Sequence, residues 1–524
     1  MADIRVDAPA HRLDALLSEA AARYGDRVAI RAWYGEITFA ELDAAASACA
    51  KAVRALLGPP PDEPGEPAAV AVAAPLHPDF AVAFYGTLRA GYLAAPVNPL
   101  HSAAELVHLF GTAGVRLAFV TAELNARLDE VRDRLPALRE AVLLGPGPVG
   151  GANDIRTLDD LVAAYELTSS EDGPPADPDA PACVLFTSGT TGPAKGVLLS
   201  RRNLTVNAAQ VAAAHRLDPS AVVLNHLPKY HLMHLNSAVY AGATQVLPAT
   251  PDPVAAVELA ATSGATHYYT IPMRLARLAA DPRLATVAAP ALRLILSGGS
   301  ALAPPVARRL ADHFGVPTVQ GYGLAETSPL THSDGPDAPR VGSVGPPVTD
   351  TDCRVVSVDT GSPVGTGERG EIQVRGPQVM LGYLDPAQPT GIDADGWLST
   401  GDVGYQDEDG YLFLVDRLKD TFKCDNYLVS PSEVERVVAA HPWVAECVVV
   451  DLPDELSGAV PAAFVVLRPD ADPAAAVAEL TTFVDGQVPY YQRLRHVELV
   501  DALPRSAAGK IQRRDLRTRL AAAR

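Results

Sequence analysis

The stretch ACVLFTSGTTGPAKGV (182–197) joins an apolar strand to a loop rich in glycine and hydroxyl groups. Residues 182–186 predict a buried strand. The glycines that follow let backbone N–H groups turn toward an anion, and hydroxyls and Lys195 add further donors. The loop differs from a Walker A loop, because two residues separate Gly192 from Lys195 and no Ser or Thr follows the lysine. We therefore predict a polyphosphate site formed by Thr187, Ser188, Gly189, Thr190, Thr191 and Lys195.

On both sides of this loop, short β-branched segments alternate with segments of helical period. Residues 67–74 (PAAVAVAA) and 115–122 (VRLAFVTA) predict buried strands, and residues 40–57 predict an amphipathic helix. Such alternation is typical of α/β layers with partly parallel sheets. From about residue 341, glycine, aspartate and short strands predominate, which predicts a small β-barrel or sheet.

After Asp416, the pattern predicts an α+β unit with two helices and two strands. The helices are expected near 430–440 and 473–486, and the strands at 446–452 and 462–469. The fold class we expect is therefore α/β: a large N-terminal domain of two layered α/β subdomains plus a small β-barrel, followed by a mobile α+β C-terminal domain.

Composition excludes several classes of protein. The chain has 524 residues and a formal charge of −19, which argues against a nucleic-acid or anionic-membrane binder. We find no basic segment followed by an apolar run at the start and no apolar run that could span a membrane. Five scattered cysteines without a CxxC fit a reducing compartment, so we expect a cytoplasmic protein. Only six of the 43 cations are lysine, and each is a candidate for a task that arginine cannot perform.

Three further motifs follow the phosphate loop in order: GYGLAETSP (321–329), GWLSTGDVGYQDEDGYLFLVDRLKD (396–420) and LPRSAAGKIQRRDL (503–516). Together with residues 182–197, they resemble the signature motifs of the adenylate-forming superfamily, which includes acyl-CoA synthetases, luciferase-like enzymes and peptide-synthetase adenylation domains. The similarity spans nearly the whole chain. It implies an N-terminal adenylation core (1–418) and a C-terminal mobile domain (419–524) that rotates about a hinge at Lys419.

The resemblance also implies roles for residues of these motifs. Tyr322 offers a flat face to a purine, and Glu326 offers a hard oxygen ligand to Mg²⁺ beside the phosphates. Asp402 and Arg417 are expected to contact the ribose, and Lys510 is expected to stabilise charge as a carboxylate attacks the α-phosphate. The glycine-rich exit SGGSAL (297–302) should lie beside adenine and the acyl group. The remaining nucleotide candidates are Gly299, Ser300, Gly321 and Gly323, with Gly298 in the substrate pocket.

The segment NHLPKYHLMHLNSAVYAG (225–242) departs from the family where the resemblance places the acyl pocket. His231 matches the family's histidine, which we count among the catalytic candidates, but His234 replaces the usual glycine. An imidazole there should fill space and add polarity, so with Lys229 it predicts a short or polar substrate. The alternative is that His234 enters a core and Lys229 faces solvent.

A second departure is DRLKDTFKCDNYLVSPSEVE (416–435), where acyl-CoA synthetases usually have glycine and this chain has Asp425 and Asn426. Asn tolerates positive φ, so the turn can survive, but the side chains and the charge of Asp425 could obstruct the thiol arm of CoA. Lys423 occupies a position where the luciferase-like branch carries a lysine for the second half-reaction.

We therefore interpret the chain as an ATP- and Mg²⁺-dependent ligase that forms an acyl-adenylate and passes it to CoA. Two alternatives concern the reaction. The adenylate could pass to an amine or a carrier protein, or the activated group could be a small oxyanion such as nitrite in natural-product biosynthesis. A third alternative is a non-catalytic nucleotide-binding relative, which the intact Lys510 and Glu326 oppose.

Overall fold

The computed structural model describes residues 13–60, 68–73, 76–145, 156–165, 177–187, 194–228, 231–425, 427–505 and 511–522. The chain divides into two compact units. The large unit contains Met1–Cys353 and Val374–Leu398, and the small unit contains Arg354–Gln373 and Ser399–Arg524. The domain boundary predicted between residues 418 and 419 lies inside the small unit, so that division remains a prediction.

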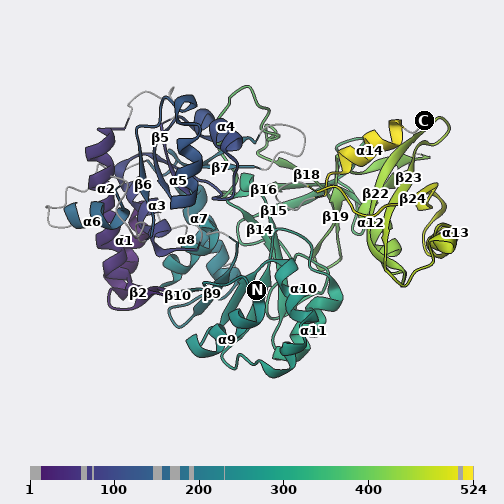
Figure 1. Ribbon diagram of the computed structural model, residues 1–524, viewed down its shortest axis with the longest axis horizontal. Coiled ribbons are helices and arrows are strands. Elements are labelled where there is room, and N and C mark those ends of the chain that lie inside the picture. Colours follow the sequence, from purple (N-terminus) through teal and green to yellow (C-terminus); the bar gives the residue numbers. More distant parts are fainter. Residues whose placement is uncertain are drawn as a thin grey trace. The chain divides into compact units, whose positions relative to one another are not determined.

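The large unit contains two sheets, as the predicted pair of α/β layers requires (Figure 1). The first, in spatial order, consists of β14 (Leu330–Ser333), β13 (Thr318–Gly323), β12 (Leu294–Ser297), β11 (His267–Thr270), β9 (Val222–His226), β10 (Thr244–Leu247), β1 (Val28–Ala32) and β2 (Gly35–Thr38). The second consists of β17 (Gly382–Tyr383), β8 (Gly196–Ser200), β7 (Pro181–Phe186), β4 (Leu93–Pro96), β3 (Ala69–Ala73), β5 (Val115–Val120) and β6 (Glu140–Leu143). The strands predicted near 67–74, 115–122 and 182–186 are confirmed as β3, β5 and β7.

Helices cover both faces of the first sheet. Successive side chains of each strand point to opposite faces, so each strand packs against helices on both sides. Leu224, Tyr268 and Ile295 pack in one core with α9 (Pro253–Ser263), α10 (Pro272–Ala280) and α11 (Pro304–Phe314). The residues next to them, among them Val223 and Tyr269, point to the opposite face and pack with α7 (Arg201–Ala214) and α8 (Leu232–Ala241). Tyr269 therefore meets α8, the helix of the predicted substrate segment.

Helix ends follow local sequence signals. The helix predicted over 40–57 is α2 (Phe39–Leu57), and it begins with a capping box between Thr38 and Glu41. Helix α8 is capped at its start by His231, whose ring accepts a hydrogen bond from the backbone N–H of Met233, and at its end by Gly242 with φ of 68°. Within the described residues, the other α-helices of the large unit are α1 (Leu13–Tyr24), α3 (Pro78–Ala90), α4 (Ala103–Ala113), α5 (Ala122–Asp129) and α6 (Leu158–Tyr165).

The segment expected to form a small barrel is a four-stranded sheet, mostly in the small unit. Its strands are, in order, β15 (Asp352–Val356), β16 (Gly370–Arg375), β18 (Leu398–Gln406) and β19 (Leu412–Arg417). The rest of the small unit is the predicted α+β part. It contains β20 (Phe422–Cys424), β21 (Tyr427–Val429), β22 (Val444–Asp454), β23 (Gly458–Leu467) and β24 (His496–Leu499), with α12 (Pro431–Ala439), α13 (Pro473–Asp485) and α14 (Arg513–Ala522).

A core of valine and leucine side chains joins these last three helices to the five-stranded sheet. Within the described residues, no helix has both the length and the apolar character needed to cross a membrane.

Candidate active site

Strands β7 and β8 hold the two ends of the predicted phosphate loop together. They pair antiparallel with Phe186 opposite Gly196. The backbone N–H of Thr187 donates to the Lys195 carbonyl at 3.0 Å, and the Lys195 N–H donates to Thr187 Oγ1 at 3.4 Å. Ser188, Gly189, Thr190 and Thr191 lie outside the described residues. The ends of the loop are thus closed as a hairpin, which brings Thr187 and Lys195 together.

Lys195 and Glu326, predicted from two separate motifs, are linked by Tyr383 of β17. The Lys195 Nζ lies 4.8 Å from the centroid of the Tyr383 ring, a cation–π contact. The Tyr383 hydroxyl donates to Glu326 Oε1 at 3.0 Å. Burial, together with the neighbouring Glu326 carboxylate, raises the pKa of Tyr383, so the phenol keeps its proton and donates.

Tyr383 is a site residue that sequence reasoning missed. It reaches this place because β17 pairs with β8, with Tyr383 opposite Val197. The backbone also contributes, since the Met380 N–H donates to the Glu326 carbonyl at 2.8 Å. A tyrosine after a glycine in a turn-rich segment carried no signal that separates it from the other tyrosines of the chain.

Two glycine-rich segments meet at the carboxyl ends of the parallel strands β12 and β13. A Cβ on Gly298 would lie 3.9 Å from the Gly321 carbonyl oxygen, and Gly299 has φ of 84°, where glycine is favoured. A Cβ on Gly323 would overlap the Pro329 carbonyl, so only glycine fits there. Ser300 follows Gly299 directly. Because Gly298 lies next to the Gly321 carbonyl, the two segments predicted to lie beside adenine are neighbours.

Tyr322, expected to stack on a purine, is 8% exposed. Its ring centroid lies 5.9 Å from that of the buried His332, with the planes at 48°. Thr331 Oγ1 donates to the Tyr322 carbonyl at 3.1 Å. The ring is therefore positioned mainly by packing within the large unit.

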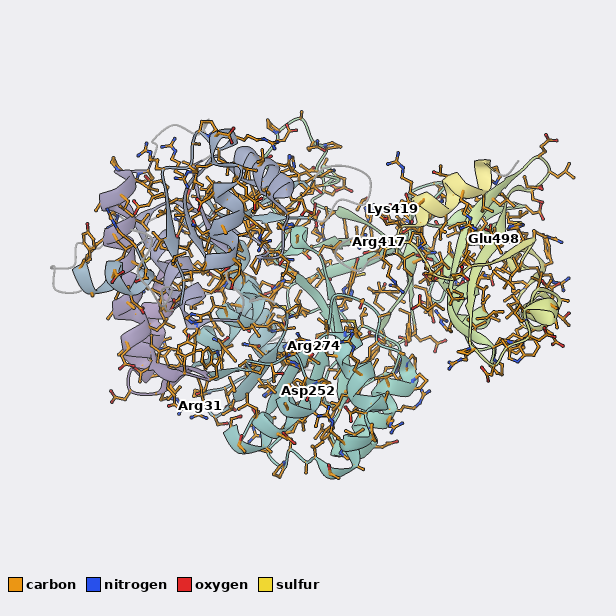
Figure 2. All side chains as sticks on the ribbon, viewed as in Figure 1. Arg31, Asp252, Arg274, Arg417, Lys419 and Glu498 are labelled. Carbon is orange, nitrogen blue, oxygen red and sulfur yellow. The ribbon has the colours of Figure 1, made fainter. Side chains whose placement is uncertain are left out.

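In the small unit, the two predicted ribose contacts lie opposite each other. Asp402 of β18 and Arg417 of β19 are antiparallel register partners, and their charged groups are 3.8 Å apart. The Arg417 side chain is 54% exposed, so its guanidinium is open to a ligand. Figure 2 shows Lys419 beside Arg417 where β19 ends. Lys510, the predicted catalytic lysine, lies outside the described residues.

His234 lies in the interior between α8 and β11. Its ring centroid is 4.3 Å from that of Tyr269 and 6.0 Å from that of His231. Burial, with His231 and His215 as further causes, holds the pKa of His234 well below the ordinary value. The His234 Nδ1 atom is buried, and among the described residues it has no hydrogen-bond partner. Lys229 lies outside the described residues.

A chain of buried polar groups continues from His234 away from α8. Tyr269 and His215 are 2.9 Å apart (Oη to Nδ1), and His267 Nε2 contacts the His215 carbonyl oxygen at 2.9 Å. We call His215, His234, His267 and Tyr269 the histidine cluster. Burial lowers the pKa of His215 to about 3 and also lowers that of His267, so these imidazoles are neutral. The sequence HYYT of β11, polar for a buried strand, was the signal that could have revealed the cluster.

Metal binding at this site would need ligands beyond the protein. Within the described residues, no group of three or more histidine, cysteine or acidic side chains is arranged to hold an ion. A cation at Glu326 would therefore take its other ligands from phosphate and water oxygens, as Mg²⁺ commonly does beside nucleotides.

Two family models of known proteins match this chain, one over most of the large unit and one within the small unit. The family model of AMP-binding enzymes matches residues 17–384, and the model of the AMP-binding enzyme C-terminal domain matches residues 433–510. The chain is similar to 4-coumarate–CoA ligase 3 of Oryza sativa subsp. japonica, with 33% identity over 85% of this chain and 81% of the relative. It is also similar to the sulfoacetate–CoA ligase of Cupriavidus necator, with 34% identity over 82% and 83%.

Among solved structures, the amide bond synthetase McbA from Marinactinospora thermotolerans is similar over 97% of this chain and 99% of that one, with 25% identity and a TM-score of 0.81. The motif order, the two matching family models and the shared fold agree with one another. The chain belongs to the AMP-binding enzymes of the adenylate-forming superfamily and is an AMP-forming acid ligase.

Proposed function

We propose that this enzyme uses ATP to activate a short or polar carboxylic acid and then transfers the acyl group to CoA. The observation that carries the choice of acid is His234, which lies against Tyr269 with its Nδ1 unpartnered. An unpaired buried nitrogen is costly, and a polar acid that supplies its hydrogen bond would bind better than an alkyl chain. The sulfoacetate ligase among the relatives is consistent with a small polar acid.

In the first half-reaction, a carboxylate oxygen attacks the α-phosphorus of ATP, and the bond to the pyrophosphate oxygen breaks. Lys195 at the end of the phosphate loop would bind the phosphates, and its contact with Tyr383 would hold its ammonium near Glu326. Mg²⁺ bound by Glu326 and phosphate oxygens would supply charge neutralisation. We assign Lys510 to the charge that develops at the α-phosphate. Positioning and charge neutralisation provide most of the acceleration in phosphoryl chemistry.

In the second half-reaction, the CoA thiol loses its proton, its sulfur attacks the acyl carbon, and AMP leaves. The hairpin of β20 and β21 bears on this acceptor, because Asp425 there has φ of 50°. A position where the resemblance to acyl-CoA synthetases implies glycine thus has left-handed backbone, which aspartate adopts only with strain. An amine acceptor is the second candidate. Asp425 favours it through its charge and bulk, and the amide bond synthetase among the structural neighbours is consistent with it.

Pyrophosphate exchange into ATP across a panel of acids tests the first half-reaction. We expect exchange with short, hydroxylated, aminated or dianionic acids and little with C12–C16 fatty acids. Strong turnover of those fatty acids would contradict the assignment of His234. AMP release followed with CoA and with amines then identifies the acceptor, and formation of a CoA thioester would remove the amine candidate.

Two variants locate the chemistry. Lys510→Ala should lower exchange by about 100-fold, the scale for losing one charged group at a transition state, whereas the exposed Arg514→Ala should leave it unchanged. His234→Gly should shift the preferred acid toward longer, apolar chains. Ser237→Gly, in the same helix, controls for the loss of helix propensity. If the Lys510→Ala variant kept the full rate of pyrophosphate exchange, Lys510 would not be the residue that stabilises charge at the α-phosphate.

A further inference from the structure

Among the described residues of the small unit, three contacts made by charged side chains join residues before Lys419 to residues after it. The partners before Lys419 belong to the four-stranded sheet or its turns, and the partners after it belong to β20 and the start of α12. The contacts are Asp416 with Ser430 and Ser432, Arg369 with Glu433, and Asp359 with Lys423.

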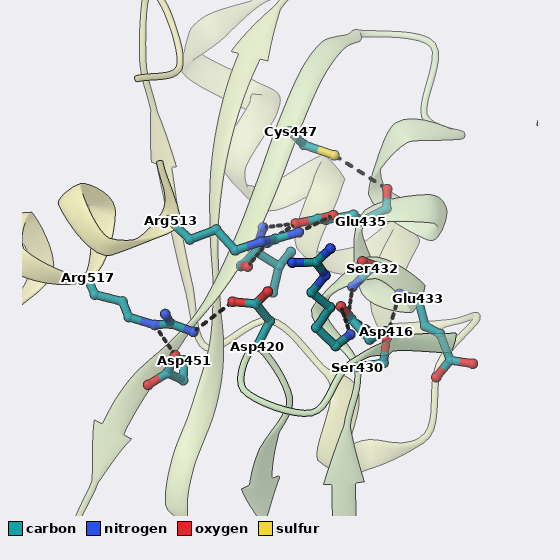
Figure 3. Close-up of polar contacts among 12 residues, drawn as sticks. Asp416, Asp420, Ser430, Ser432, Glu433, Glu435, Cys447, Asp451, Arg513 and Arg517 are labelled. Carbon is teal, nitrogen blue, oxygen red and sulfur yellow. Dashed lines mark hydrogen bonds and ion pairs between the residues drawn. The ribbon is translucent and has the colours of Figure 1, made fainter. Parts of the chain in front are cut away.

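The first contact caps helix α12 from outside its own segment (Figure 3). Ser430 Oγ and the backbone N–H of Ser432 both donate to Asp416 Oδ2 at 2.9 Å. Ser430 is also the N-cap of α12, accepting from the Glu433 N–H at 3.3 Å. A carboxylate beside the first turn of a helix is stabilised by the free N–H groups there. Asp416 is therefore held by α12 itself.

The other two contacts are ion pairs across the same junction. Arg369 Nη1 lies 2.5 Å from Glu433 Oε2, which also accepts from Gln492 Nε2 at 3.3 Å. The Lys423 ammonium pairs with the Asp359 carboxylate. The arginine and both members of the lysine pair are at least 43% exposed, so each ion pair is weak alone and easily replaced by water.

We propose that these three contacts form a latch that holds residues 419–524 against the four-stranded sheet in one of two working orientations. A rotation of the chain after Lys419 would move every partner on one side away from its partner on the other. The latch therefore opens as a unit, and its strength sets the fraction of molecules in each orientation. Lys423 pairs with Asp359 while the latch is closed, and opening of the latch separates the two groups.

The idea that the two orientations serve the two half-reactions rests on the proposed function. The latch itself does not rest on the proposed function, because the distance between the two sides of the junction can be measured without substrate. Glu408, in the turn between β18 and β19, and Glu479, on α13, are both exposed and lie on opposite sides of Lys419. Spin labels on Glu408→Cys and Glu479→Cys, with Cys353 and Cys447 replaced by serine, would report this distance by pulsed electron resonance.

The decisive variants reverse charges in the latch. Arg369→Glu and Glu433→Arg should each shift the populations of the label distances by about threefold to tenfold, the scale of one lost polar contact. The double variant should restore the wild-type distribution by remaking the pair. Arg436→Glu is the matched control, since Arg436 lies in the same helix and makes no ion pair or hydrogen bond within the described residues. Asp359→Asn provides a second test at a surface position where folding is not at risk.

In single-turnover experiments, the same variants should change the ratio of the rate of adenylate formation to the rate of acyl transfer. The half-reaction that becomes faster should be the one served by the orientation whose population increases. Distances that all single reversals leave unchanged, or a double variant that does not restore them, would overturn the latch. Altered distances in a protein that activates no acid would instead refute the proposed function and leave the latch in place.

Discussion

Two polar clusters, one in each unit, are stabilised in different ways. In the large unit, the histidine cluster uses neutral imidazoles and a phenol, with contacts of 2.9 Å and no charged partner among them. In the small unit, ion pairs join α12, α14 and the sheet (Figure 3). There Arg513 contacts Glu435, and Arg517 contacts Asp451 and Asp420. We call these five residues the charged network.

The comparison indicates which polar contacts stay fixed in the folded protein and which can rearrange. Neutral groups without access to water lose their hydrogen bonds if the packing opens, so His215, His267 and Tyr269 are a permanent part of the core. Ion pairs with an exposed partner can exchange that partner for water at little cost. The two ion pairs that cross the junction at Lys419, Arg369 with Glu433 and Asp359 with Lys423, are of this kind.

The largest expected effect is the acid sensitivity of the large unit. Burial lowers the pKa of His215 and of His332 to about 3, below the ordinary value near 6.5. The neutral form therefore contributes stability that is fully present above about pH 6.5 and is lost as the pH falls toward 3. The loss is about 1.4 kcal/mol per pH unit for each residue, or about 2 kcal/mol each at pH 5.

Hydrogen exchange between pH 8 and 5, corrected for intrinsic rates, should show protection falling first in the large unit. His215→Gln should flatten this dependence, because glutamine can keep a hydrogen bond to Tyr269 without titrating. The same pH dependence in both units, or in this variant and the wild type, would remove the distinction between them.

Arg513→Ala should give the next largest effect, in the small unit. Arg513 makes a forked contact with Glu435 (2.5 and 3.0 Å) and donates to the Val449 carbonyl at 2.6 Å. Its loss leaves the mostly buried Glu435 carboxylate without a cationic partner, at a cost of about 2–4 kcal/mol. Calorimetry should show a lower unfolding temperature for the small unit. The exposed neighbour variant Arg514→Ala should not change it, and equal shifts in both would mean that the fork contributes nothing specific.

Tyr383→Phe tests the contact between the phosphate loop and Glu326. The ring that faces Lys195 remains, but the hydroxyl that fixes Glu326 is lost, a change of about 1 kcal/mol. We expect about a fivefold rise in the KM for ATP in pyrophosphate exchange, with folding unchanged. Tyr405→Phe, which alters a tyrosine stacked on Phe413, is the control. An unchanged KM would show that Glu326 needs no support from Tyr383.

Asp425→Gly should give the smallest effect. Glycine adopts the observed φ of 50° without strain, so the free energy of unfolding should rise by up to about 1 kcal/mol. AMP release with CoA should increase in the same variant if Asp425 obstructs the thiol arm. Asp350→Gly, at a strained position in the large unit with φ of 58°, separates relief of strain from a change at the acceptor. A destabilised Asp425→Gly variant would show that the carboxylate makes a useful contact.

The sequence by itself determined the family, the order of the motifs and most strands near them. These features depend on local composition, since an apolar run before a glycine-rich turn forms a strand and a loop whatever lies far away. Asp402 and Arg417 were both selected as ribose contacts from one motif, but their opposite positions on β18 and β19 came from the structure. Hinge, phosphate-loop and catalytic-lysine roles for Lys419, Ser188, Gly189, Thr190, Thr191 and Lys510 remain predictions.

Only the tertiary structure decided what joins distant segments. Tyr383 reaches Glu326 because β17 adds to the edge of the second sheet, and no local pattern encodes that pairing. His234 was noticed as a departure from the family, but its neighbours Tyr269 and His215 come from β11 and the end of α7. Asp416 and Ser430 meet because α12 folds back onto β19. Local sequence sets which groups are available, whereas packing of apolar faces sets which of them meet.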